Sequence, residues 1–269
     1  MSVEAVQQLS HKKLGDNDVQ NCPLCGQSHP ISFKGIGAMN DGKAEITTSK
    51  GFSFCNCSNI FFTDWSNMEP AVYNEEYYKK YQEFSTKGYL DGVVGYANRY
   101  YPVFEENRAC IRNFLEVGAI NDILLDEAKK KGWEVVGNDI FEHETKHKQI
   151  VGDFENVKID EKFDVIWASH VFEHFKEPLK VIDKCNDTLS GGGLLFIAMP
   201  DPWFINHAII HHSPTTWCHL HIREHHIMWD MDSFIDKVLE RGFELILSKR
   251  NAGIDFLTHG DFHLVFKKV

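Results

Sequence analysis

Histidine and aromatic side chains are concentrated in one segment of this chain, residues 200–230. Seven of the fifteen histidines lie there, and histidine is the side chain whose ordinary pKa suits proton transfer near neutral pH. The segment also carries Trp203, Trp217 and Trp229, whose rings offer flat apolar surfaces to a ligand. These residue types predict a ligand-binding segment with an acid–base group. Its histidines are His207, His211, His212, His219, His221, His225 and His226.

Three interpretations of these histidines stay open. The first is a general base from the group Glu224–His225–His226, oriented by Asp201 or Asp230. The second is a divalent metal site, because His219 and His221 lie two residues apart and a bound metal can lower the pKa of a hydroxyl group. The third is that they are polar loop residues that satisfy backbone groups.

Four cysteines near the N-terminus have the spacing of a metal site. Cys22 and Cys25 form a C-x₂-C knuckle followed by Gly26, and Cys55 and Cys57 are two residues apart. Residues two apart on a strand face the same side. In a chain without a secretory signal, such pairs favour tetrahedral zinc over disulfides. Free buried thiols are the alternative. We expect the scattered cysteines Cys110, Cys185 and Cys218 to be structural.

The elements that must position a site are clearest in residues 113–140. An apolar run ends at Gly118, a helical pattern follows up to Gly132, and a second apolar run ends at Asp139. An acid at the tip of the second strand, 21 residues after the turn glycine, is where a nucleotide-binding βαβ unit holds ribose hydroxyls. Ile120 and Asp122 stand where such a turn usually has glycines.

Further strands and helices alternate after this unit. Residues 163–168 read as a fully buried strand, residues 177–189 as a helix, and residues 194–200 as another strand after a Ser-Gly-Gly-Gly turn. Strands that alternate with helices at this spacing predict a doubly wound α/β fold with a mostly parallel sheet. Ligands of such sheets bind at the carboxyl ends of the strands.

The order and wording of these segments resemble class I S-adenosylmethionine-dependent methyltransferases, which have a Rossmann-like sheet. The resemblance covers about residues 106–269 and is strongest in FDVIWASHVFEH and LSGGGLLFIAMP. It implies that Glu116 lies by the methionine part of the cofactor, that Asp139 binds the ribose, and that Asp153 faces the adenine. It also implies a histidine at the position of His174. The remaining implied cofactor-binding residues are Gly118, Ala119, Ile140, Phe154, Ser169 and His170.

A second resemblance concerns the whole chain. A cysteine knuckle, a cysteine pair followed by Ile-Phe-Phe, an aromatic YNEEYY stretch and a methyltransferase core resemble bacterial sugar methyltransferases with an N-terminal zinc-binding region. The C-methylating members carry a further C-terminal domain, which we do not expect here. The resemblance therefore implies O-methylation of a sugar or glycan hydroxyl. From the residue types, we interpret residues 200–230 as the acceptor-binding lid, with His225, His226 and Asp201 as catalytic candidates. His174, expected near the sulfonium group, is a further candidate.

These patterns divide the chain into four parts. We expect a polar tail at residues 1–20, a small zinc-ribbon module at residues 21–65, an aromatic helical linker or cap at residues 66–105, and the methyltransferase domain at residues 106–269. Two other functions stay open. The fold could be a non-catalytic binding module with a degenerate cofactor loop, or the ribbon could recruit a macromolecular partner.

Composition limits the setting of the protein. The formal net charge of −11 argues against a nucleic-acid polyanion as the main substrate. The sequence contains no run of 18 apolar residues, the length that a membrane span needs, and its N-terminus lacks the apolar core of a signal peptide. We therefore expect a cytoplasmic protein that binds S-adenosylmethionine, structural zinc and a small-molecule or glycan acceptor.

Overall fold

The computed structural model describes residues 19–30, 33–34, 39–40, 43–44, 51–55, 57, 60–63, 79, 87–201, 224–251 and 260–269. Much of the predicted ligand-binding segment lies outside these residues, as does nearly all of the helix predicted in YNEEYYKKYQ. The site candidates that lie outside them are Trp203, His207, His211, His212, Trp217, His219 and His221.

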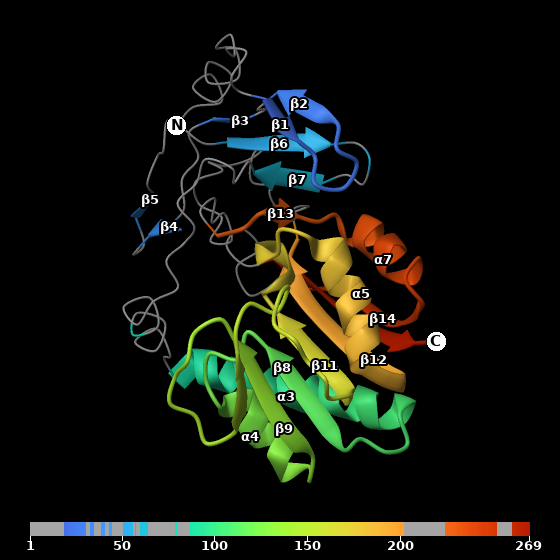
Figure 1. The fold of residues 1–269 in the computed structure, drawn as a ribbon. Helices are drawn as coiled ribbons and strands as arrows, with labels where there is room; N and C mark the ends of the chain where they lie inside the picture. The colour runs from blue at the N-terminus through green and yellow to red at the C-terminus, as the bar shows by residue number, and fades with distance from the viewer. Residues whose placement is uncertain are drawn as a thin grey trace.

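A seven-stranded sheet with the order β10-β9-β8-β11-β12-β15-β14 organises the larger part of the described chain (Figure 1). Neighbouring strands are parallel from β10 to β12, and β15 runs antiparallel to both β12 and β14. The strands are β8 (Asn113–Val117), β9 (Glu134–Asp139), β10 (Lys148–Val151), β11 (Phe163–Ser169), β12 (Leu189–Pro200), β14 (Phe243–Asn251) and β15 (Asp261–Lys268).

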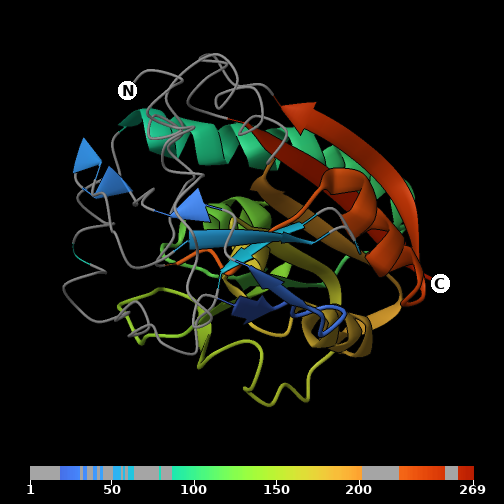
Figure 2. The same ribbon diagram turned by 90° about the horizontal axis from the view of Figure 1, so that it is seen from above.

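Helices cover both faces of this sheet. α3 (Lys87–Asn107) and α4 (Ile123–Lys130) pack on one face, and η1 (Phe172–His174), α5 (Pro178–Thr188) and α7 (Met231–Leu239) pack on the other. Seen from above, α3 and α5 lie on opposite sides of the strands (Figure 2). The predicted doubly wound, mostly parallel sheet is therefore confirmed. Among the helices that the structure describes, none is long and apolar enough to span a bilayer.

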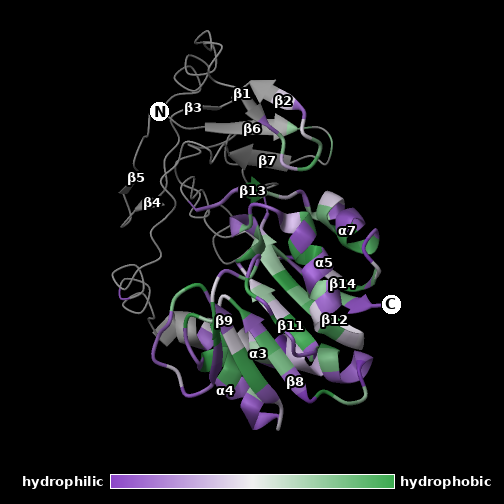
Figure 3. Ribbon diagram, in the orientation of Figure 1, coloured by the Kyte–Doolittle hydropathy of each residue, from purple (hydrophilic) through white to green (hydrophobic). Residues whose placement is uncertain are grey.

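The core follows the apolar runs of the sequence. All residues from Phe163 to Ala168 are buried, as expected for a central parallel strand that is covered on both faces. Trp167 stacks on Phe196 of β12 with ring centroids 3.8 Å apart. The central strands are coloured as hydrophobic, whereas the outward faces of α5 and α7 carry hydrophilic residues (Figure 3).

The Ser-Gly-Gly-Gly segment differs from its prediction as a turn. β12 begins at Leu189 and continues through the glycines, and its register against β11 shifts between Leu189 and Leu194. Gly192 has a φ of +67°, a conformation that glycine adopts at little cost. The glycines therefore form an irregular stretch inside a strand, because the chain continues in the same direction.

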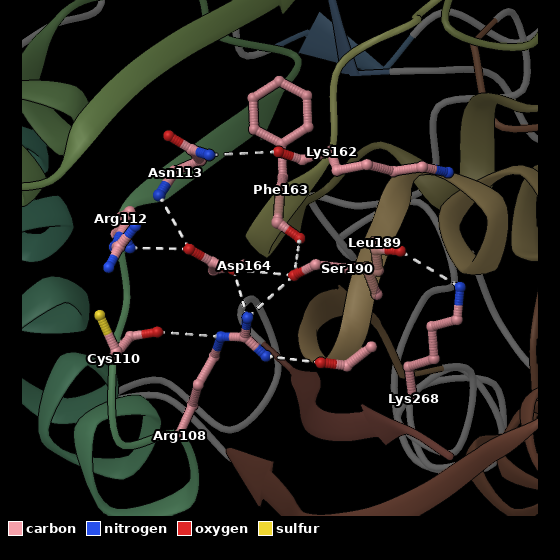
Figure 4. Close-up of polar contacts among 11 residues, drawn as sticks. Arg108, Cys110, Arg112, Asn113, Lys162, Phe163, Asp164, Leu189, Ser190 and Lys268 are labelled. Carbon is pink, nitrogen blue, oxygen red and sulfur yellow. Dashed lines mark hydrogen bonds and ion pairs between the residues drawn. The ribbon is translucent and has the colours of Figure 1, made fainter.

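A polar cluster fixes the opposite end of the sheet from the predicted site (Figure 4). Asp164 of β11 accepts hydrogen bonds from the backbone N–H groups of Arg112, at 2.7 Å, and Asn113, at 3.1 Å. It also forms an ion pair with Arg108, which in turn donates to Ser190 Oγ at 2.9 Å. This cluster joins the chain leaving α3 to β8, β11 and β12.

Smaller sheets lie at the other end. β1 (Val19–Asn21) pairs with β2 (Ser28–Pro30), and β4 (Met39–Asn40) with β5 (Lys43–Ala44). A four-stranded sheet has the order β13-β7-β6-β3. Its strands β3 (Phe33–Lys34), β6 (Gly51–Cys55) and β7 (Ile60–Thr63) come from the cysteine region, whereas β13 (Ile227–Met228) follows the predicted catalytic histidines. The cysteine region is thus joined to the candidate site by backbone pairing.

Candidate functional site

The turn after β8 is shaped by Gly118. This residue has a φ of +76°, and a Cβ atom there would lie 2.7 Å from Val171 Cγ2. The N–H groups of Gly118 and Ala119 both donate to the carbonyl oxygen of Asn138, at 2.8 and 2.9 Å. Both the backbone conformation and the space therefore require glycine at this position.

Asp122 stands where the turn usually has a glycine, and its carboxylate is bound by neighbouring groups. The Asp122 carboxylate is held by the hydroxyl of Thr145 and by the N–H of Lys146, at 2.9 Å. Asn121 Oδ1 accepts the N–H of Ile123 at 3.1 Å, at the start of α4. Asp122 thus ties the segment after β9 to α4.

Carboxylates gather at this end of β8 and β9. Glu116 Oε2 is buried and accepts no hydrogen bond from the residues that the structure describes. Burial raises the pKa of Glu116 well above its usual range, and the charges of Asp122 and Asp139 raise it further. A buried carboxyl group of this kind suits a ligand that carries a positive charge or a hydrogen-bond donor.

This arrangement fits the cofactor that the sequence implies. S-adenosylmethionine carries a positive charge on its sulfonium group and another on its ammonium group. Glu116 offers an acceptor without a described partner, and Asp139 lies at the tip of β9, where βαβ units bind ribose. Ile140 beside it is 48% exposed, so its apolar surface is available to a ligand.

The predicted adenine contacts Asp153 and Phe154 already have partners within the protein. Asp153 Oδ1 accepts the N–H of Glu155 at 2.9 Å, and its Oδ2 accepts the side chain of Asn156 at 2.6 Å. Phe154 is buried, packs 6.2 Å from Phe175 between ring centroids, and lies under the Lys184 ammonium group. Phe154 is therefore part of the hydrophobic core. Its residue type and position in the sequence alone do not distinguish a core residue from an adenine contact.

Ser169 is the last residue of β11 and His170 follows it, as predicted for residues at the carboxyl edge. His170 has a φ of +54°, which is rare for a residue with a side chain. Its ring lies between two carboxylates, with Nδ1 3.6 Å from Glu173 Oε1 and Nε2 3.6 Å from Asp261 Oδ2. Burial alone would lower the pKa of His170, but the two carboxylates outweigh it and raise the pKa to about 10.

Asp261 extends this cluster to α3. His263 Nε2 and the Tyr96 hydroxyl lie 3.0 and 3.2 Å from Asp261 Oδ2, and the Tyr100 hydroxyl contacts His263 Nδ1. Burial alone would raise the pKa of Asp261, but hydrogen bonds with His170 and His263 hold it well below its usual range. Sequence reasoning missed Asp261 and His263, because β15 lies far in the chain from His170 and from α3, which they contact.

Predicted catalytic histidines meet at η1. His225 Nε2 lies 3.9 Å from Glu173 Oε1, and the rings of His174 and His225 are 4.8 Å apart between centroids. His226 N–H donates to the carbonyl oxygen of Glu173 at 2.6 Å. A carboxylate oxygen of Glu173 and one ring nitrogen each of His174 and His225 all lie within 4.8 Å of one another. The structure thus brings three of the four predicted catalytic residues together, and adds Glu173.

The two candidate orienting acids have other partners as well. Asp201 is buried and pairs with Arg250 Nε at 2.8 Å. Asp230 caps α7, where its Oδ1 accepts the N–H of Ser233 at 3.1 Å. Their role in orienting a histidine stays a prediction. Trp229, expected on the ligand-binding surface, is buried against Phe234 instead. A sequence pattern cannot distinguish such a core tryptophan from a binding one.

The four N-terminal cysteines converge as predicted. Sγ of Cys22 lies 3.6 Å from Sγ of Cys57, and Sγ of Cys25 lies 3.6 Å from Sγ of Cys55. All four sulfur atoms lie within 4.8 Å of one another. Zinc–sulfur bonds of about 2.3 Å in a tetrahedron place sulfur atoms about 3.8 Å apart, so these residues fit zinc.

Comparisons with known proteins agree with this architecture. The sequence matches the family described as "Methyltransferase domain" over residues 74–248, more than half of the chain. No protein of curated function matches the sequence.

Solved structures share the fold at low identity. The plantazolicin methyltransferase BpumL in complex with SAH has a TM-score of 0.56 and 13% identity, covering 73% of this chain and 91% of its own. A S-adenosylmethionine-dependent methyltransferase from Clostridium acetobutylicum has a TM-score of 0.53 and 10% identity, covering 72% and 96%. The complex between the Haloferax volcanii Trm112 methyltransferase activator and the putative methyltransferase has a TM-score of 0.51 and 14% identity. It covers 68% of this chain and 94% of its own.

Proposed function

Because the chain belongs to the methyltransferase-domain family, we propose that it transfers the methyl group of S-adenosylmethionine to a hydroxyl oxygen of a sugar or glycan. The observation that carries the donor half of this proposal is the buried Glu116 oxygen beside the Gly118 turn. Glu116 binds the cofactor's ammonium group, and Asp139 binds its ribose hydroxyls. Solved structures with this fold that contain SAH support the same donor.

The acceptor half rests on the histidines at η1. Transfer to a hydroxyl requires that its proton be removed as the oxygen attacks the methyl carbon. His174 and His225 form a close pair, of which His174 is the more exposed. Burial lowers the pKa of His226 to about 3, so this ring is a poor base at neutral pH. We therefore assign proton removal to the His174–His225 pair, with His226 in a supporting role.

Bound S-adenosylmethionine would supply an activated methyl group. The protein's own groups then perform two tasks. Gly118 and Asp139 hold the donor at the carboxyl edge of the sheet, which fixes the direction of approach. The His174–His225 pair accepts the hydroxyl proton. We leave Asp201 as a structural partner of Arg250 at the end of β12.

Zinc at Cys22, Cys25, Cys55 and Cys57 is the second part of the proposal. The sulfur geometry supports a closed structural site, since four protein ligands leave no position for a substrate. Four thiolates of this kind also favour a reducing compartment, which agrees with a cytoplasmic location.

A non-catalytic module is the second candidate function. It is favoured by the turn after Gly118, where Ile120 and Asp122 replace glycines and the Asp122 carboxylate is tied to residues 145–146. This arrangement stiffens the turn, and a stiff turn could exclude the cofactor.

A transfer assay separates the two functions. We expect the zinc-loaded protein to methylate a component of a sugar and nucleotide-sugar mixture when supplied with methyl-labelled S-adenosylmethionine. Mass spectrometry should identify the labelled product as an O-methyl sugar. Asp139→Ala should abolish both cofactor binding and transfer, because the ribose hydroxyls lose their acceptor. Unchanged cofactor affinity in a folded Asp139→Ala protein would remove that residue from the site.

A further inference from the structure

We propose that Glu173 is a positioning residue that balances the positive charge arriving on the His174–His225 pair when the acceptor hydroxyl loses its proton. The inference rests on the proposed function and deepens it. Glu173 lies in η1, directly before His174, and neither the sequence pattern nor the resemblance gave it a role.

The surroundings of Glu173 are unusual for a carboxylate. The residue is only 1% exposed, and neither carboxylate oxygen accepts a hydrogen bond from the residues that the structure describes. Its nearest ionisable neighbours are His170 Nδ1 at 3.6 Å and His225 Nε2 at 3.9 Å. A buried carboxylate without hydrogen bonds is costly, so nearby positive charge must compensate it.

The charged groups at this edge form a connected row. Glu173 and Asp261 flank the protonated ring of His170, and Asp261 also contacts His263 Nε2 at 3.0 Å. The pair Asp201–Arg250 is neutral as a unit, and the pKa of His226 is low enough to keep its ring uncharged. Of the two carboxylates that flank His170, Glu173 is the one that lies beside His225.

Methyl transfer brings a positive charge next to Glu173. The C–S bond breaks as the new C–O bond forms, so the sulfonium group becomes a neutral thioether. The hydroxyl proton moves to the histidine pair, which becomes an imidazolium. Positive charge thus disappears at the donor and appears next to Glu173. A preformed negative charge at that place stabilises the product side without reorganisation.

The backbone supports this reading. His170 is held at a φ of +54°, a conformation that residues with a side chain adopt at a cost in stability. The strained conformation places the His170 ring between Glu173 and Asp261. The fold therefore maintains the two-carboxylate arrangement at a cost in stability.

The test is the titration of the histidine pair by NMR. Full-length, zinc-loaded protein with ¹³C-labelled histidines is titrated with SAH present and absent, and His174→Asn and His225→Asn assign the signals. In Glu173→Gln we expect the midpoint of the pair to fall by about one pH unit or more, because an opposite charge has been removed. Glu173→Asp should retain most of the midpoint. Glu244→Gln, an exposed strand position, is the matched control.

A second variant should shift the titration midpoint of the histidine pair in the opposite direction. His170→Asn removes the positive neighbour while keeping a residue type that tolerates positive φ. We expect the midpoint of the pair to rise, because Glu173 then loses the positive charge of His170. Once an acceptor is known, Glu173→Gln should lower the kcat plateau and move its rising limb to lower pH, a change that loss of packing alone would not produce.

Two results would overturn the proposal. One is an unchanged midpoint in folded Glu173→Gln and His170→Asn proteins. The other is a second equivalent of divalent metal in the wild type that Glu173→Gln loses, which would make Glu173 a metal ligand. Failure of the wild type to bind SAH would instead refute the proposed function, since the coupling of Glu173 to the histidines is measurable without cofactor.

Discussion

Glu116 is the residue on which recognition of the donor depends most. Its buried oxygen is unsatisfied among the described residues, and Asp122 and Asp139 add negative charge around it. A protein maintains such a group at a cost in stability, because burial and like charge both oppose ionisation. A cationic ligand removes that cost, so binding should be coupled to the loss of a proton from Glu116.

We expect the affinity for S-adenosylmethionine to rise with pH through the raised pKa of Glu116. Only the ionised carboxylate attracts the ammonium group, so affinity is weaker below that pKa and constant above it. Glu116→Gln should weaken binding roughly ten- to a hundredfold, equivalent to about 1.5–3 kcal/mol for a hydrogen bond to a charged group. Calorimetry in buffers of different ionisation enthalpy measures both the affinity and the proton released.

The control for this prediction is the pH dependence of the variant. Glu116→Gln cannot ionise, so its affinity should no longer change across the same range. An affinity that varies with pH equally in both proteins would assign the effect to another group.

At this scale, sequence reasoning placed Glu116, Gly118 and Asp139 at or directly after the ends of two strands of one βαβ unit, and the structure has them at the ends of β8 and β9. Their binding of the cofactor stays a prediction. It missed Glu173 and Asp261, whose roles depend on partners from other elements. His170 meets Asp261 across 91 positions of the chain, and no local spacing encodes such a contact. The motif FEH offered the one available signal, an acid directly before a predicted histidine.

Among the elements, β11 depends on the polar cluster at its start (Figure 4). Burial alone would raise the pKa of Asp164, but hydrogen bonds from Arg112, Ser190 and Asn113 and the charge of Arg108 outweigh it and lower the pKa. The carboxylate therefore contributes stability above its unfolded-state pKa, near 3.9, and this contribution is lost as pH falls through the lower folded-state value.

Asp164→Asn should accordingly destabilise the protein at pH 7 by about 2–3 kcal/mol, the scale of hydrogen bonds to a charged group. The difference between wild type and variant should shrink as pH falls below about 4. Urea unfolding at pH 7 and at pH 3.5 measures it. Asp236→Asn, at an exposed position of α7, serves as the control. An equal loss of stability at both pH values would point to packing rather than charge.

Element prediction succeeded where apolar periodicity was strong and failed where composition misled. The buried run of β11 required both of its faces to be covered, so its place in the middle of the sheet followed. The three glycines of β12 suggested a turn, but the chain keeps its direction, because β12 pairs with β11 at Leu189 and again from Leu194 onward. The glycines lie in the irregular stretch between these positions, which local composition does not distinguish from a turn.

At the scale of the whole molecule, the cysteine region is connected to the histidine segment by one sheet. Ile227 and Met228 of β13 pair with Phe62 and Phe61 of β7, whose neighbour β6 ends at Cys55. Buried Cys22 and Cys55 also share a hydrophobic cluster with Ile227 and Trp229. Metal at the cysteines should therefore support the backbone that follows His225 and His226.

Removal of zinc should weaken this joint. We expect one zinc ion per chain, lost in Cys25→Ser, together with a lower Tm and faster amide exchange at Ile227 and Met228. Exchange in β11 should change much less, since its partners belong to the large sheet. Cys110→Ser removes an exposed cysteine outside the cluster and is the matched control. Unaltered exchange in β13 after metal loss would show that the ribbon is independent of the site.

Sequence spacing predicted the four cysteines and the sheet but not their connection, because β13 is two residues long and its partner lies 165 positions earlier. Such a short strand forms only where another edge is already present.

The most direct test of the central claim is a calorimetric titration of the metal-analysed protein with S-adenosylmethionine and SAH. We predict one site per chain for each ligand, with affinity lost in Asp139→Ala and weakened in Glu116→Gln. The absence of binding to a folded, zinc-loaded protein at millimolar ligand would contradict the account. It would show that Ile120 and Asp122 close the turn and that the fold acts as a scaffold.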